Sequence, residues 1–397
     1  MKFSRALALG SFCLSAVLAA PVSDFDANVA KGLRLIQTSE ETAPYWATED
    51  QKLELLRADK GFFDLTETYH QVEEQKAKGI KAIVERATYP SPSKSSTVKS
   101  IISTLSTSRM QSSLSTLTAY NNRYYTSSTG SAASTWIYNQ LTSIASGKSG
   151  ITVSQFSHSW AQKSIIAKFN GASTTAAAVI FGCHIDSINL SSPSSGRAPV
   201  IFGCHIDSIN LSSPSSGRAP GADDNGTGTV NLIEVFRALV AAGFSPTRPV
   251  EFHFYAAEEV GLLGSQAVAA NYKSAGKSVY AMINLDMTGY FKPGSTEVIA
   301  LVTDRVDSGL NTYLRSLISA YCAIPAGTDY CGYACSDHAS WNTQGYPAAF
   351  PFEAPTVSEN PYIHSASDTT SVSGFSWTHS LEFAKLAAAA AVELGSV

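Results

Sequence analysis

Apolar residues are spaced in two ways along the chain, and the two spacings alternate from about residue 150 onward. Stretches that are continuously apolar or alternate with polar residues predict strands, whereas apolar residues three or four positions apart predict helices. The predicted strands cover residues 152–158, 164–169, 178–183, 249–256, 278–285 and 348–352. The predicted helices cover residues 105–120, 226–242, 262–275, 307–321 and 377–394. This alternation predicts an α/β domain whose central sheet is covered by helices on both faces.

The first 20 residues have the order of a secretory signal peptide. Lys2 and Arg5 give a positive start, an apolar stretch follows, and small residues near position 20 offer a cleavage site. The alternative is a buried N-terminal helix. No other uncharged apolar stretch approaches the length of a membrane span, because residues 375–394 are interrupted by Glu382 and Lys385. We therefore expect a soluble protein that is secreted and has no membrane partner.

Residues 21–86 differ sharply in composition from the segment that follows. They are rich in Glu, Asp and Lys and carry helix-like stretches at 51–58 and 69–84, whereas the hundred residues after Glu85 contain no acid. After a signal peptide, such a step predicts a pro-segment removed near Arg86. The alternative is a small N-terminal domain that stays attached. The expected units are a signal peptide at 1–20, a pro-segment at 21–86 and a main domain at 87–397.

Composition narrows the possible partners and compartments. The formal net charge of −4 gives no electrostatic basis for binding nucleic acid. Cys331 and Cys335 lie four positions apart and can pair in an oxidising compartment, while the other cysteines do not indicate a disulfide scaffold.

Acidic residues and histidines gather at the ends of the predicted strands. Two familiar hydrolase motifs, G-x-S-x-G and H-E-x-x-H, are absent from the sequence. An open α/β sheet builds its site at the ends of its strands, so we expect these side chains to converge. In chain order they are His205 with Asp207, Asp223 with Asp224, Glu258 with Glu259, Asp286, and His364.

This set satisfies the requirements of a two-zinc centre. Two zinc ions about 3.5–4 Å apart need a bridging carboxylate, and each ion also needs a histidine and an acid. Glu258 is then left over as a general base for the attacking water. Asp207 lies on the same strand face as His205 and can accept its other N–H, which fixes the tautomer. Each motif alone has an ordinary structural explanation, such as an acidic helix start, but their combination favours a metal site.

Five segments in order resemble the secreted two-zinc aminopeptidases, the bacterial and fungal leucine aminopeptidases. They are GADDNGTGT, YAAEEVGLLGSQ, NLDMTGY, CGYACSDHASW and NPYIH, and the resemblance extends from about Tyr120, in YNNRYYTSSTG, to the C-terminus. It implies a mixed, twisted sheet between helices. It also implies hydrolysis of the N-terminal bond of peptides and proteins, with a preference for leucine or other large apolar first residues. Fungal members carry a signal and a pro-segment, in agreement with the step near Arg86.

The resemblance assigns a role to each residue of the site. Asp224 would bridge two Zn²⁺ ions, His205 and Asp286 would hold one ion, and Glu259 and His364 would hold the other. Glu258 would be the general base. The remaining assignments are Tyr333 as the donor to the oxyanion, Cys331–Cys335 as a disulfide, and Met287, Phe352 and Ile363 as the pocket for the first side chain.

The chain departs from the family in one place, because residues 179–199 and 200–220 are the same 21 residues in tandem. Related sequences have one such strand and loop. Asp224 lies 19 positions after His205 and 40 after His184, and the shorter spacing is close to the family's, so we expect His205 to be the ligand. His184 stays open as the alternative, because closure entropy grows only slowly with loop length and about 20 extra residues cost little free energy. Perfect identity of the copies also fits an error in the sequence.

Two alternatives to the aminopeptidase differ from it in the site residues that they would lack. A single-zinc glutaminyl cyclase or a carboxypeptidase-like hydrolase on the same scaffold would lack one of the five ligands. An inactive binding module would have lost Glu258 or Asp224, and the chain has both. We also expect a monomer, with N-glycosylation at Asn210 or Asn189 in the Ser/Pro-rich loop.

Overall fold

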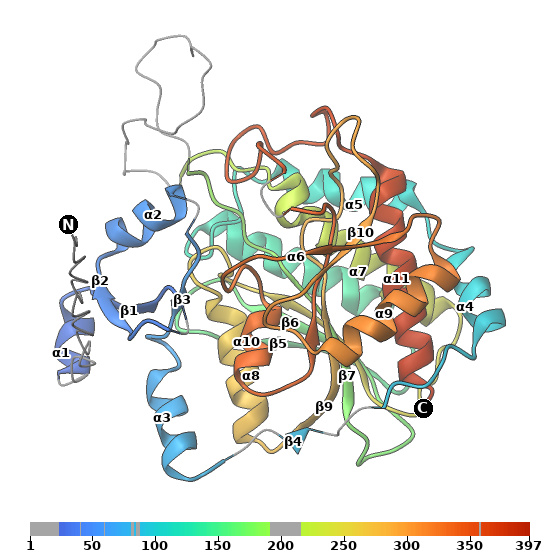
Figure 1. Cartoon of the computed structure of the whole chain (residues 1–397), viewed down its shortest axis with the longest axis horizontal. Coiled ribbons are helices and arrows are strands. Elements are labelled where there is room, and N and C mark those ends of the chain that lie inside the picture. Colours follow the sequence, from blue (N-terminus) through green and yellow to red (C-terminus); the bar gives the residue numbers. More distant parts are fainter. Residues whose placement is uncertain are drawn as a thin grey trace, which may run out of the picture.

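The structure is a computed structural model of the chain, and it describes residues 24–397 except 40, 59, 81–82, 85–87, 191–215 and 357–358. In this part of the chain the central sheet is mixed and has seven strands. Helices cover both of its faces (Figure 1). The strand order is β12 (Ala348–Ala349), β9 (Ser278–Asn284), β7 (Ala178–His184), β8 (Val250–Tyr255), β6 (Ser164–Phe169) and β5 (Ile151–Phe156), and β4 (Ile83–Val84) also pairs with β9.

The three central strands run in the same direction. β7 pairs in parallel with β8 on one side and with β9 on the other. β6 pairs antiparallel with β8, and β5 pairs antiparallel with β6. Every residue of β7 is buried, as expected for a parallel strand that is covered on both faces. The carboxyl ends of β7, β8 and β9 therefore meet at one edge of the sheet. The acids and histidines of the sequence lie at this edge.

Two hydrophobic layers hold the sheet between the helices. On one face, Phe181 and Phe252 pack with residues of α4 (Ser95–Ile102), α5 (Thr107–Ala119), α6 (Ser128–Ile144), α7 (Gly228–Ala241), α9 (Ser308–Tyr321) and α11 (Trp377–Gly395). On the other face, Ile180 and Met282 pack with residues of α8 (Leu263–Ser274) and α10 (His338–Thr343). Burial of these apolar side chains is the main force that fixes the sheet, at roughly 25 cal/mol per Å² of apolar surface.

A second, smaller sheet adjoins the main one. It consists of β11 (Ala326–Asp329), β10 (Ile299–Val302) and β13 (Pro351–Phe352), in that order. The predicted strand at 348–352 is thus wrong as a single element, because β12 joins the central sheet and β13 joins the small one. The intervening Phe350 is buried in a separate apolar cluster beside Phe352.

The N-terminal part of the chain forms a unit of its own beside α8 and α10 (blue in Figure 1). Its sheet has the order β2 (Tyr45–Ala47), β1 (Arg34–Gln37) and β3 (Phe63–Asp64), with helices α1 (Phe25–Ala30), α2 (Glu49–Arg57) and α3 (Tyr69–Ala77). The predicted helix at 69–84 ends early, since residues 83–84 form β4. The removal of residues 21–86 and the cleavage near Arg86 remain predictions, and residues 1–23 and 85–87 lie outside the described part.

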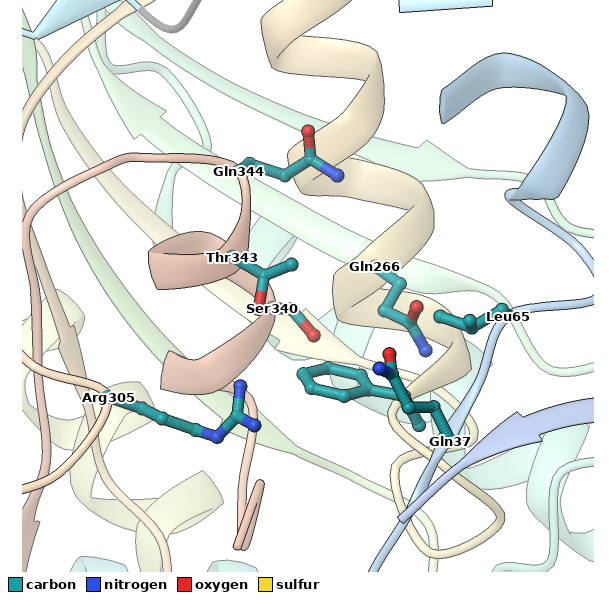
Figure 2. A pocket seen from close by; sticks show the side chains of 8 residues that line it. Gln37, Leu65, Gln266, Arg305, Ser340, Thr343 and Gln344 are labelled. Atoms are coloured by element: carbon teal, nitrogen blue, oxygen red, sulfur yellow. The ribbon is translucent and has the colours of Figure 1, made fainter. Parts of the chain in front are cut away.

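The N-terminal unit contacts the main domain through backbone and side-chain hydrogen bonds. The Asp64 N–H donates to the Gly261 carbonyl over 3.1 Å, and the Gln266 amide donates to the Asp64 carbonyl over 3.0 Å. A cavity of about 70 Å³ remains between the two parts. Figure 2 shows Gln37 and Leu65 of the N-terminal unit on one side of it and Arg305 and Thr343 on the other. The packing of the N-terminal unit on the main domain is therefore incomplete.

Most of the predicted elements are present with ends shifted by one or two residues. The strand at 164–169 is confirmed at the same positions, and the predicted helix at 377–394 is α11. The helix α6 and the strands β10 and β11 were not predicted. No helix in the described residues has both the length and the apolar character needed to cross a membrane.

Candidate metal centre

Three parallel strands bring the candidate ligands to one edge of the sheet. β7 ends at His184, which pairs with Tyr255 at the end of β8, and Glu258 and Glu259 follow three and four residues later. Asp286 follows the end of β9 by two residues. Asp224 lies in the turn Ala222–Thr227 that precedes α7. The strand ends thus supply most of the site.

Two groups of side chains share one acid. The first group is His184, Asp224 and Asp286, and the second is Asp224, Glu259 and His364. Within each group the candidate ligand atoms all lie within 4.8 Å of one another. His184 and three of the acids are buried, whereas the His364 side chain is 30% exposed. The two groups are therefore adjacent candidate sites for a cation, and they have one carboxylate in common.

The shared carboxylate divides its two oxygens between the groups. Asp224 Oδ1 lies 3.1 Å from His184 Nε2, and Asp224 Oδ2 lies 3.0 Å from His364 Nε2. On either side, His184 Nε2 is 3.2 Å from Asp286 Oδ1, and His364 Nε2 is 3.0 Å from Glu259 Oε2. Each histidine therefore faces the shared acid and one further acid.

The pKa values of the acids are shifted in opposite directions. Burial raises the pKa of Asp224, but hydrogen bonds from His184 and His364 outweigh burial and hold that pKa below its usual range. Burial, together with the charge of Asp224, raises the pKa of Glu259 to about 7. Burial raises the pKa of Glu258 well above its usual range, assisted by the charge of Asp286. Buried carboxylates at this density are strongly destabilising unless a cation neutralises them.

Asp186 connects the strand of His184 to the turn of the two glutamates. Its Oδ1 accepts the Glu258 N–H over 3.0 Å and its Oδ2 accepts the Glu259 N–H over 3.1 Å. The same Oδ1 lies 3.4 Å from His184 Nδ1. Asp186 thus occupies the place that we expected Asp207 to take.

The structure places the first copy of the repeat in the central sheet, as β7. His184 and Asp186 belong to residues 179–199, whereas His205, Asp207 and the candidate glycosylation site Asn210 lie outside the described residues. The chain reaches β7 from β6 through a short connection, in which the Ser173 N–H donates to the Thr247 carbonyl, and the Val179 N–H within β7 donates to the Pro249 carbonyl. The first copy follows this connection directly. The shorter spacing to Asp224 favours the second copy, but it is a weak criterion because loop length costs little free energy.

Further hydrogen bonds hold the side chain of Asp286 and the backbone of Asp224 in place. Ser336 Oγ donates to Asp286 Oδ2 over 2.6 Å, and Asp368 accepts the N–H groups of Asp223 and Asp224 over 2.9 and 3.1 Å. Asn225 Oδ1 accepts the Gly228 N–H, which ties the Asp224 turn to α7. The sequence does not predict these contacts of Ser336, Asp368 and Asn225. Ser336 alone has a sequence signal, because it lies in the segment CGYACSDHASW.

The residues expected to line the substrate pocket lie in one apolar cluster beside the acids. Met287 and Phe352 are in its buried core, and Ile363 packs against them. Cys331 and Cys335 border the same cluster and form a disulfide, so the expected pairing is confirmed. The cluster thus lies next to the edge of the sheet that carries the candidate ligands.

Two other predicted site residues contact neighbouring segments. Tyr333 is partly buried, and a Cβ atom on Gly61 would lie 2.2 Å from carbons of its ring. The N-terminal unit therefore packs directly against Tyr333. Asn189 is partly buried, and its amide nitrogen donates to the Arg218 carbonyl. Glycosylation of Asn189 or Asn210 remains a prediction.

Comparison with known proteins agrees with this geometry. The family model "Peptidase family M28" matches residues 164–391. The chain is 38% identical over 409 residues to leucine aminopeptidase 1 of Arthroderma otae, a match that covers 99% of this chain and 100% of that protein. The chain belongs to peptidase family M28.

Other M28-type relatives and structures cover nearly the same extent. Leucine aminopeptidase 1 of Blastomyces gilchristii is 38% identical over 414 residues, which covers 99% of each protein. The crystal structure of the LapA aminopeptidase of Legionella pneumophila superimposes with a TM-score of 0.73 at 28% identity, covering 93% of this chain and 96% of that one. The family resemblance inferred from the five sequence segments and the predicted fold class are confirmed.

Proposed function

We propose that this M28 peptidase is a secreted two-zinc aminopeptidase that hydrolyses the N-terminal bond of peptides and proteins. The observation that supports this proposal most strongly is the division of Asp224 between two histidine–acid pairs. A carboxylate that offers one oxygen to each side is what two adjacent metal ions require. The similarity to leucine aminopeptidases supports a preference for leucine or other large apolar first residues.

The ligand set fits zinc. Imidazole nitrogen and carboxylate oxygen are both common zinc ligands, and each group offers one imidazole and two carboxylates. His184 and Asp286 would hold one ion, Glu259 and His364 the other, and Asp224 would bridge the two. When bound, the ions supply Lewis acidity and lower the pKa of the attacking water.

Glu258 is the proposed general base. Its Oε2 lies 3.9 Å from His184 Nε2, so its carboxylate borders the proposed metal site without belonging to either ligand group. Asp186 holds its backbone N–H, which orients the turn. Glu258 accepts the proton of the attacking water and returns it to the leaving amino group. A carboxylate beside the attacking water can hold this proton between the two steps.

Substrate recognition is assigned to the apolar cluster and Tyr333. Met287, Phe352 and Ile363 present an apolar wall for the first side chain of the substrate. The Tyr333 hydroxyl would donate to the oxygen of the attacked carbonyl, which becomes negative in the transition state.

Residues 21–86 are proposed to restrain the enzyme until they are removed. The N-terminal unit contacts Gly261, two residues after Glu259, and Gly61 packs on Tyr333. Both contacts lie beside proposed catalytic groups. The disulfide between Cys331 and Cys335 is in keeping with an oxidising compartment, and the signal at residues 1–20 supports secretion. A monomer is proposed, with peptide N-termini as its partners.

The test is hydrolysis of leucine-p-nitroanilide by the processed protein, with and without a chelator, together with a metal count. We expect activity that the chelator abolishes and that Zn²⁺ restores, with two zinc ions per chain. A firm count of one zinc would favour the cyclase-like alternative. Metal binding without hydrolysis of any aminoacyl anilide would contradict the aminopeptidase assignment.

A further inference from the structure

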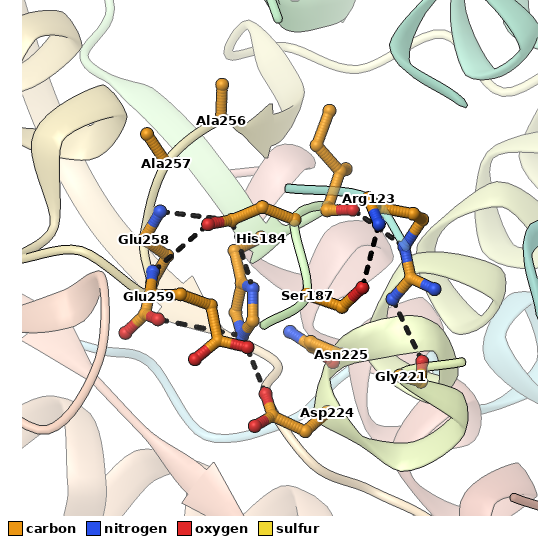
Figure 3. Close-up of polar contacts among 12 residues, drawn as sticks. Arg123, His184, Ser187, Gly221, Asp224, Asn225, Ala256, Ala257, Glu258 and Glu259 are labelled. Atoms are coloured by element: carbon orange, nitrogen blue, oxygen red, sulfur yellow. Dashed lines mark hydrogen bonds and ion pairs between the residues drawn. The ribbon is translucent and has the colours of Figure 1, made fainter. Parts of the chain in front are cut away.

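Arg123 is fully buried, and its side chain donates three hydrogen bonds to backbone carbonyls. Figure 3 shows Arg123 beside Ser187 and Gly221, with a dashed line from its guanidinium to Gly221. Its Nε donates to Ile185 O over 2.8 Å, its Nη1 to Pro220 O over 2.5 Å and its Nη2 to Gly221 O over 2.9 Å. Burial of a guanidinium carries a high desolvation cost, which hydrogen bonds and nearby negative charges must offset. Its three acceptors come from two segments that are far apart in the sequence.

The two segments carry the proposed metal ligands. Ile185 directly follows His184 at the end of β7, and Gly221 begins the turn that presents Asp224 three residues later. One planar group thus joins the backbone beside a terminal ligand to the backbone beside the bridging one. The residues between these segments include 191–215, which the structure does not describe. The connection through Arg123 does not depend on that stretch.

A second, parallel contact reinforces the first. The Arg123 N–H donates to Ser187 Oγ over 2.9 Å, and the Ser187 hydroxyl donates to Ala219 O over 2.9 Å. The Arg123 backbone therefore bridges the same two segments one step further from the ligands. Four hydrogen bonds start from this single residue, and all of them end on the two segments.

The local backbone is shaped to receive the guanidinium. Gly221 has φ of +54°, and a Cβ atom there would lie 2.5 Å from Arg123 Nη2 and 2.7 Å from Asp224 O. Any other residue would be strained and would push the guanidinium away. The fork of an arginine sends its donors in fixed directions, which a lysine ammonium does not reproduce.

The charge of Arg123 also suits its surroundings. Burial lowers the pKa of Arg123, and the negative charges of Asp368, Asp186, Asp224 and Glu259 oppose that effect. Arginine stays protonated because its pKa lies so far above neutral. A permanent positive charge thus lies among the acids without pairing directly with any of the proposed ligands.

We propose that Arg123 is a positioning residue of the metal centre, which fixes the end of β7 at His184 relative to the turn that carries Asp224. This inference rests on the proposed function, because the two residues are treated as metal ligands. It gives a function to the YNNRYY segment, which the ligand set leaves without one. It also explains how the centre stays intact while the connection between its ligands holds an extra 21 residues.

The matched control is Arg218, whose exposed guanidinium also donates to two backbone carbonyls, those of Tyr120 and Thr118. Arg218→Met removes a guanidinium whose hydrogen bonds end at the C-terminal end of α5 and not on the backbone beside His184 or Asp224. Arg123→Met removes the guanidinium, and Arg123→Lys keeps the charge but not the fork. All three variants are made in the full chain.

The test is titration of the metal-free protein with Co²⁺, followed by its visible absorption spectrum. We expect Arg123→Met to bind one Co²⁺ equivalent at least tenfold more weakly than the unmodified chain, with an altered spectrum. Arg123→Lys should fall between the two, and Arg218→Met should match the unmodified chain.

A folded Arg123→Met protein, judged by circular dichroism, with unchanged Co²⁺ affinity and spectrum would overturn the inference. If Arg123→Met does not fold, the same result for Arg123→Lys overturns it. The proposed function fails separately if the unmodified chain binds fewer than two equivalents. The positioning inference is then decided by comparing the Arg123 and Arg218 variants for whatever metal binds.

Discussion

Asp224 Oδ1 lies 3.1 Å from His184 Nε2, although 40 positions separate the two residues in the sequence. The second copy of the repeat lies between them in the sequence, and its His205 is only 19 positions before Asp224. The first copy nevertheless supplies the strand. His184 is therefore the proposed ligand at the end of this strand.

His184→Ala and His205→Ala form a matched pair, because each changes the same residue in the same local sequence. We expect His184→Ala to lose one of two zinc ions and to reduce kcat/KM by at least a hundredfold, since a proposed ligand is removed. His205→Ala should keep both zinc ions and full activity. Zinc analysis with a leucine-p-nitroanilide assay measures both effects. The reverse pattern would show that the second copy forms the strand in solution.

Deletion of residues 200–220 gives the same protein as deletion of residues 179–199, because the two copies are identical. We expect this single-copy protein to keep both zinc ions and full activity. Shortening the connection from His184 to Asp224 by half lowers its closure entropy cost, so the free energy of unfolding should rise by about 0.6 kcal/mol. Chemical denaturation of both chains measures this difference. Loss of metal binding in the single-copy protein would mean that the second copy supports the centre.

Glu258→Gln keeps the size of the side chain but removes its ability to accept a proton. We expect the variant to retain two zinc ions, because Glu258 belongs to neither ligand group. Its kcat should fall by about 10²–10⁴-fold, as is typical when a general base is lost. Zinc content and steady-state kinetics are measured on the same preparation. Activity near that of the unmodified enzyme would remove Glu258 from the mechanism.

Asp64 is buried between Lys52 and Arg34, with its Oδ2 2.8 Å from a nitrogen of each. Burial raises the pKa of Asp64, but the charges of Lys52 and Arg34 outweigh burial and lower that pKa below its usual range. A depressed folded-state pKa contributes stability above the unfolded value of about 3.9, and this is lost as the pH falls through the folded value. The N-terminal unit should therefore stay folded at pH 5–7 and loosen only below about pH 4.

Limited proteolysis of the unprocessed chain between pH 3 and pH 7 tests this prediction. Asp64→Asn should make the N-terminal unit sensitive to the protease at pH 7 and should raise the activity of the unprocessed chain. The control is Asp50→Asn, an exposed acid of α2. Equal protease resistance of all three proteins at pH 7 would show that the buried ion cluster does not hold the unit in place.

The long periodic elements were predictable because their apolar pattern reports burial directly. The helix at 377–394 and the strand at 164–169 have a buried face along their whole length, and both were found. The strand at 348–352 was predicted as one element because a short apolar run does not reveal that the chain changes from one sheet to another at Phe350. Identical sequences carry no pattern that distinguishes one copy from the other. The strand of His184 therefore had to be decided by the structure.

Arg123 shows a different limit of sequence reasoning. Its partners are backbone carbonyls of Ile185, Pro220 and Gly221, and a carbonyl is present at every position of any chain. No residue type at the acceptor positions signals such a contact. The glycine at 221 is the one sequence trace, because a close approach and a positive φ both require it. The acids and histidines, by contrast, were predictable from their chemistry and from their place at the strand ends.

Arg123 connects the end of β7 to the turn before α7, and this connection has an evolutionary consequence. Residues 179–190 and 216–220 together supply 17 of the 21 positions of one copy, so the described residues beside the two candidate ligands cover most of a single unit. A tandem duplication at this point therefore leaves a complete working copy and a surplus one. Under the proposed ligand assignment, His205 is released from binding metal and Asp207 from orienting that histidine. Mutations can accumulate in them, and new binding functions can arise, without loss of the parent activity.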